Sequence, residues 1–142
     1  MSKSKICNWL QAASAWGPVV AYMACIYLSS AQPQMLLEGK TSVSDKTLHT
    51  VAYFGLALLA YRAAAMVSLR PRFNPGIQSL TVAVLYGVWD EGHQHFVPGR
   101  TMELGDLLAD AAGALIAVTA IVLIRTWMNK GGKQIVRRRE RL

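Results

Sequence analysis

Four long apolar segments constrain the fold of this 142-residue chain more than any other feature. We expect helices over about 12–31, 48–69, 77–96 and 104–127, because roughly 20 helical residues span the hydrocarbon core of a bilayer. Pro18 is expected near the start of the first helix, where proline is tolerated. With 53% hydrophobic and only 16% charged residues, the chain has too few charges to cover a soluble domain. The prediction is an all-α, integral membrane four-helix bundle that forms a single domain over 1–142.

The basic and acidic residues fall on opposite sides of this predicted bundle. Twelve of the fifteen basic residues lie on the side of the N-terminus, and seven of the eight acidic residues lie on the other side. By the positive-inside rule, both termini are cytoplasmic, and 128–142 forms a basic cytoplasmic tail. This topology accounts for the net charge of +7, so we expect no nucleic-acid partner. Lys3 and Lys5 before the first segment also fit a cleaved signal peptide, but the long uncharged run favours a retained helix.

Polar residues gather where the helices end on the acidic side. Helical spacing on the third segment gives two adjacent stripes, Tyr86–Asp90–Gln94 and Gly87–Glu91–His95. The neighbouring carboxylates of Asp90 and Glu91 would repel each other and lose hydration, which favours a functional role over a structural one. We therefore expect Asp90, Glu91 and His49 to be the candidate catalytic residues, with the carboxylates as acid and base and the imidazole as a proton carrier.

A second set of residues is expected to bind the substrate at the same end. Its members are Asp45, Lys46, Gln94, Arg100, Asp106 and Asp110. Val97–Arg100 has proline and glycine at the positions of a type II turn, which would bring Arg100 back over the carboxylates. The small residues Gly113, Ala114 and Ala117 would let the fourth helix approach a neighbour closely. Asp106 and Asp110 also fit a simpler role near a helix N-terminus, where acids are favoured.

Other classes of function remain open from the residues alone. A metal-dependent intramembrane hydrolase would use the set His49, Asp90, Glu91, His93 and His95. The chain has no HExxH motif and its histidines are scattered, so we expect neither a metal nor another cofactor. A transporter would need polar groups along the full depth of the bundle, whereas the inner halves of the last three segments are nearly apolar. A structural or partner-binding protein would use the same polar groups to hold its helices together, and a homodimer is a further alternative for so small a bundle.

Three ordered motifs carry a resemblance to a known family. They are Asp45-Lys46-x-x-His49, Asp90-Glu91-x-x-Gln94-x-Phe96-x-Pro98-Gly99-Arg100 and Asp106-x-x-x-Asp110-x-x-Gly113. The stretch from about Ser29 to Ala117, which also includes Ser29-Ser30-x-Gln32-Pro33 after the first segment, resembles the VanZ-like family of small bacterial membrane proteins. His95 and Met102–Glu103 depart from the usual pattern of that family.

The resemblance implies a four-helix protein of the bacterial inner membrane, with its site on the extracytoplasmic side. The founding member of the family is associated with low-level resistance to teicoplanin, a lipidated glycopeptide that targets cell-wall precursors. We therefore expect an acidic pocket that binds or modifies the headgroup of a membrane lipid or a lipid-linked envelope intermediate. The resemblance does not say whether a reaction takes place, so an enzymatic activity is left open.

Overall fold

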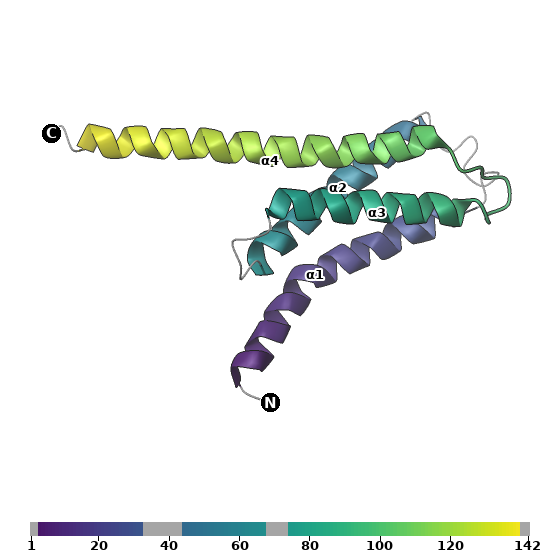
Figure 1. Cartoon of the computed structure of the whole chain (residues 1–142), viewed down its shortest axis with the longest axis horizontal. Helices are drawn as coiled ribbons and strands as arrows, with labels where there is room; N and C mark the ends of the chain where they lie inside the picture. The colour runs from purple at the N-terminus through teal and green to yellow at the C-terminus, as the bar shows by residue number, and fades with distance from the viewer. Residues whose placement is uncertain (1–2, 33–43, 68–73, 140–142) are drawn as a thin grey trace.

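The computed structural model describes residues 3–32, 44–67 and 74–139, and this part of the chain is helical, without strands. The four helices are α1 (Lys3–Ser30), α2 (Asp45–Val67), α3 (Pro75–Gln94) and α4 (Leu104–Arg139). Successive helices run in opposite directions, so the C-terminal ends of α1 and α3 lie at the same end of the bundle as the N-terminal ends of α2 and α4 (Figure 1). We call this the polar end of the bundle. The expected all-α four-helix architecture is confirmed.

Three of the helices are long and apolar enough to cross a membrane. The candidate spans are Trp9–Ser30, Asp45–Val67 and Leu104–Gly131. Helix α3 has 20 residues, but its last turns contain Asp90, Glu91 and Gln94, and these polar residues lower its mean hydropathy. The three candidate spans indicate that the chain is a membrane protein. Helix α3 lies beside α4 along much of the length of α3 (Figure 1).

The boundaries of α1 and α4 differ from those expected. Helix α1 begins at Lys3, so Pro18 lies inside it, and the expectation that Pro18 occupies a first turn was wrong. Internal proline removes a backbone hydrogen bond and bends a helix, and α1 curves away from the bundle toward its N-terminus (Figure 1). Helix α4 continues to Arg139, through most of the segment expected to form a tail.

The helices pack through small residues. Helix α2 contacts each of the other three, and α4 packs against α2 and α3 without touching α1 in the described part of the chain. The core shared by these helices is made largely of alanine, with few large side chains. Its alanines are Ala15, Ala57, Ala60, Ala63, Ala83, Ala114 and Ala117. Such short side chains let helix backbones approach closely, which is how helices associate in lipid.

The closest approach is between α2 and α4 at Gly113. A Cβ atom added at Gly113 would overlap the backbone carbonyl of Thr50 and lie 3.1 Å from the backbone nitrogen of Phe54. The expected close approach of the fourth helix through its small residues is confirmed. Because Asp110 lies one turn before Gly113 and His49 lies next to Thr50, this contact also sets the separation of two candidate site residues.

Candidate functional site

Buried polar side chains concentrate at the polar end of the bundle. Those at this end are Ser30, His49, Asp90, Glu91, Gln94, Asp106 and Asp110. Among the described residues, the one other buried polar side chain is Ser79, whose hydroxyl donates to the carbonyl of Ala57 at 2.8 Å. In the ranges that the structure describes, the buried carboxylates and the buried imidazole therefore lie together at the polar end.

The two stripes on α3 face different helices. Tyr86 and Asp90 face α1, because the Tyr86 hydroxyl donates to the carbonyl of Met23 at 2.6 Å and Asp90 contacts Ser30. The second stripe faces α4, since a Cβ atom at Gly87 would lie 2.9 Å from Asp110 Oδ2. Adjacent residues on a helix point about 100° apart, so the carboxylates of neighbours in the sequence enter separate networks.

His95 does not extend the second stripe as the sequence suggested. It caps the C-terminus of α3 and is exposed. The ring of His93 lies 4.6 Å from that of Tyr27 and 6.0 Å from that of Trp89, measured between centroids. Neither histidine belongs to a group of potential metal ligands in the described part of the chain.

Asp90 is held by side chains from α1 and α3. Its exposed fraction is 1%, and it accepts a 2.6 Å hydrogen bond from the Ser30 hydroxyl on Oδ1. Its Oδ2 accepts from the Gln94 amide at 3.3 Å, and the Gln94 oxygen in turn accepts from Arg100 Nη1 at 3.0 Å. Both carboxylate oxygens of Asp90 thus have partners, which is the condition under which a buried charge is tolerated.

Arg100 is positioned by the expected turn. Gly99 has a φ of 80°, and the Arg100 amide donates to the Val97 carbonyl at 3.1 Å, so the type II turn is confirmed. Its guanidinium does not reach the carboxylates directly. It donates instead to the neutral oxygens of Gln94 and of the Gln32 carbonyl, and within the described ranges it forms no ion pair.

A second network joins α2, α3 and α4 through His49, Asp110 and Glu91. His49 Nδ1 lies 2.9 Å from Asp110 Oδ1, and Glu91 Oε2 accepts from the backbone N–H of Glu103 at 3.1 Å. Glu91 and Asp110 are fully buried, with exposed fractions of 0%. Their other oxygens, Glu91 Oε1 and Asp110 Oδ2, are buried and have no hydrogen-bond partner among the residues that the structure describes, as is also true of the hydroxyl of Tyr53.

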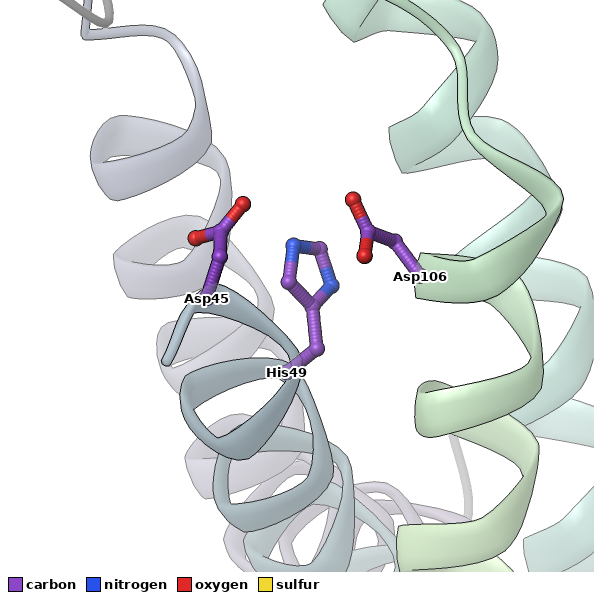
Figure 2. A group of neighbouring side chains, drawn as sticks. All are labelled: Asp45, His49 and Asp106. Carbon is purple, nitrogen blue, oxygen red and sulfur yellow. The ribbon is translucent and has the colours of Figure 1, made fainter. Parts of the chain in front are cut away.

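Asp45, Lys46 and Asp106 lie beside His49 at the outer edge of this network. The ring of His49 lies between the carboxyl groups of Asp45 and Asp106 (Figure 2). Lys46 Nζ lies 3.0 Å from Asp106 Oδ1 and 3.1 Å from Glu103 Oε2, so two carboxylates neutralise its charge. Asp45 and Lys46 are exposed while His49 and Asp106 are buried, so the network leads from the surface into the bundle.

The structure brings all nine expected site residues to the polar end, but it adds others. Ser30 binds Asp90, and Glu103 contacts Glu91 through its backbone and Lys46 through its side chain. Ser30 belongs to the stretch that resembles the VanZ-like family, but no spacing rule predicted its hydrogen bond to Asp90. No spacing rule links Glu103 to Glu91, because they meet only after the turn reverses the chain.

A family model described as VanZ/LLP1 matches residues 8–125, most of the chain. The protein belongs to this family. No curated protein and no solved structure gives a significant match. The match covers the four helices up to Arg125 and every residue of both networks, so the polar end lies within the family domain. The resemblance seen in the sequence is therefore confirmed, and this VanZ/LLP1 protein is a membrane protein.

Proposed function

We propose that this VanZ/LLP1 protein lies in the bacterial inner membrane with both termini in the cytoplasm. Its polar end would then face the outer leaflet and bind or modify the headgroup of a lipid or a lipid-linked cell-wall intermediate. The distribution of charge supports this orientation through the positive-inside rule. Lipid tails suit the remaining surface, where Leu10, Val51, Leu85 and Leu115 are among many exposed apolar side chains.

The environment of Arg100 is the single observation that supports the headgroup proposal. Its guanidinium is half-buried at the polar end and bonds only to neutral oxygens within the described ranges, so its positive charge remains available. Guanidinium groups bind phosphate and carboxylate oxygens through two parallel hydrogen bonds. Lys46 is the weaker candidate of the two, because Asp106 and Glu103 already neutralise it.

The neighbouring networks would supply acid and base groups to a bound headgroup. His49 and Glu91 lie in the network whose outer edge is at Asp45 and Lys46, where a proton could pass between the surface and the buried carboxylates. Sequestering a lipid-linked precursor, or altering its headgroup, is the route by which the protein would contribute to resistance against lipoglycopeptides of the teicoplanin type. A structural role fits Asp90 better than these residues, since both of its oxygens are already bonded.

Binding of undecaprenyl phosphate to the full chain in phosphatidylcholine nanodiscs tests the proposal. Replacing Arg100 with glutamine removes the charge, and we expect about 10- to 100-fold weaker binding, the equivalent of one charged hydrogen-bonded contact. Arg125→Gln is the matched control, because Arg125 lies on α4 away from the polar end and donates to the Tyr61 hydroxyl at 2.7 Å. Equal affinities for the unmodified protein and Arg100→Gln would refute the proposed role of Arg100.

A further inference from the structure

The network of His49, Glu91 and Asp110 has the composition of a metal site. One ring nitrogen of His49 and one carboxylate oxygen from each of the two acids all lie within 4.8 Å of one another. The three side chains come from three helices, and all are buried. We propose that these residues bind a divalent cation of the Mn²⁺ or Zn²⁺ type.

Two unpartnered carboxylate oxygens are a second observation that supports this inference, in addition to the clustering of acids. Glu91 Oε1 and Asp110 Oδ2 are buried and accept no hydrogen bond from any residue in the described part of the chain, although the second oxygen of each is bonded, to Glu103 and His49 respectively. Burying a carboxylate is costly unless its charge is hydrogen-bonded, paired, neutralised by a proton or bound to a metal. Here the carboxylates of Glu91 and Asp110 have one imidazole, that of His49, between them. A cation of charge +2 would balance the two negative charges.

The spacing of the three groups decides which atoms would coordinate the ion. Metal bonds to imidazole nitrogen and carboxylate oxygen are about 2.1 Å long, so two ligands at right angles around one ion are about 3.0 Å apart. His49 Nδ1 and Asp110 Oδ1 are 2.9 Å apart, which is a hydrogen-bond distance, so an ion would be bound by the free oxygens Asp110 Oδ2 and Glu91 Oε1, and by His49 either through its other ring nitrogen or after loss of that hydrogen bond. An imidazole with two carboxylates combines ligand types that suit Zn²⁺ and Mn²⁺, and leaves open positions for water or a substrate oxygen.

A second group, Asp45, His49 and Asp106, also brings three potential ligands within 4.8 Å of one another (Figure 2). It is the poorer site, because Asp45 is exposed and Asp106 Oδ1 already lies 3.0 Å from the ammonium of Lys46. A divalent cation at that group would be repelled by the positive charge of Lys46. The ion is therefore assigned to the buried group.

A cation at this position would change the character of the polar end. Without it, the buried carboxylates repel an anionic headgroup, and with it, their charge is balanced and an open coordination position of the ion can accept a phosphate oxygen. This consequence rests on the proposed headgroup function, whereas the ion site itself does not. Cation binding is therefore measured without added lipid-linked ligand, so that failure of one proposal leaves the other standing.

Titration of the full-length protein in detergent with Mn²⁺, followed by electron paramagnetic resonance, tests the site. We expect one saturable site in the unmodified protein and at least about 100-fold weaker binding after Glu91→Gln or Asp110→Asn, since even residues behind the ligands contribute 10- to 100-fold. Asp45→Asn, which changes an acid of the exposed group, tests the alternative set of ligands, and His95→Gln, at an exposed histidine outside both groups, is the matched control and should bind as the unmodified protein does. Zn²⁺ should displace the bound Mn²⁺.

Two outcomes would overturn the assignment. The first is the absence of saturable binding of either ion to the unmodified protein, as expected if a shared proton satisfies the carboxylates instead. The second is loss of binding in Asp45→Asn with retention in Glu91→Gln, which would move the ion to the exposed group. Thermal unfolding of the unmodified protein decides the matter if the variants do not fold, because a bound ion must raise the melting temperature and EDTA must reverse the rise.

Discussion

Replacing Gly113 with alanine tests the close contact that positions the site. The added methyl group would overlap the Thr50 carbonyl and lie 3.1 Å from the Phe54 backbone nitrogen. A backbone cannot turn aside as a side chain can, so α2 and α4 must separate. Overpacking of this kind costs about 1–3 kcal/mol, and we expect the upper part of that range. Alanine also favours the helix by about 1 kcal/mol, which leaves a net loss of about 1–2 kcal/mol.

Gly131→Ala is the matched control on the same helix. A Cβ atom at Gly131 would meet nothing within 4 Å, so this change should stabilise the protein by up to about 1 kcal/mol. The difference between the two variants isolates the clash, at about 2–3 kcal/mol. Equilibrium unfolding in mixed detergent micelles, followed by circular dichroism, measures both free energies. Equal stability of Gly113→Ala and Gly131→Ala would refute the packing argument.

Two further predictions concern the polar end and its orientation. Ser30→Ala removes the 2.6 Å hydrogen bond to the buried carboxylate of Asp90 and should lower the free energy of unfolding by about 1.5–3 kcal/mol, whereas Ser14→Ala, at an exposed site, should change it by less than about 0.5 kcal/mol. In a chain without its native cysteines, Met102→Cys should react with a membrane-impermeant thiol reagent in intact cells, and Gly131→Cys should react only after permeabilisation. The reverse pattern of labelling would contradict the orientation.

Much of the fold followed from local sequence. Apolar length predicted the four helices, and proline and glycine order predicted the turn at Val97–Arg100. The small residue Gly113 predicted that α4 approaches a neighbouring helix closely, and the structure identifies that neighbour as α2. These features depend on the types and order of residues that are close together in the chain, and both can be read directly from the sequence. The start of α1 did not follow, because a helix can extend through polar residues such as Lys3 and through Pro18.

The site was less predictable, since it depends on which helix each stripe faces. The sequence placed Asp90 and Glu91 side by side as a repelling pair, but the structure bonds Asp90 to Ser30 on α1 and turns Glu91 toward α4. Arg100 was expected over the carboxylates of Asp90 and Glu91, yet it connects only to Asp90, and does so through Gln94. Spacing fixes the angle between residues on one helix, whereas the partner across the interface follows from packing.

The most direct test of the account compares Glu91→Gln with Asp90→Asn. The central claim is that the network of Glu91, Asp110 and His49 is kept for function, while Asp90 holds the helices together. Unfolding in detergent with EDTA present should show Glu91→Gln to be as stable as the unmodified protein or more so, because the change removes an unpaired buried charge. Asp90→Asn should lose about 1–3 kcal/mol, since it disrupts a fully bonded carboxylate. A large loss for Glu91→Gln with none for Asp90→Asn would contradict the claim.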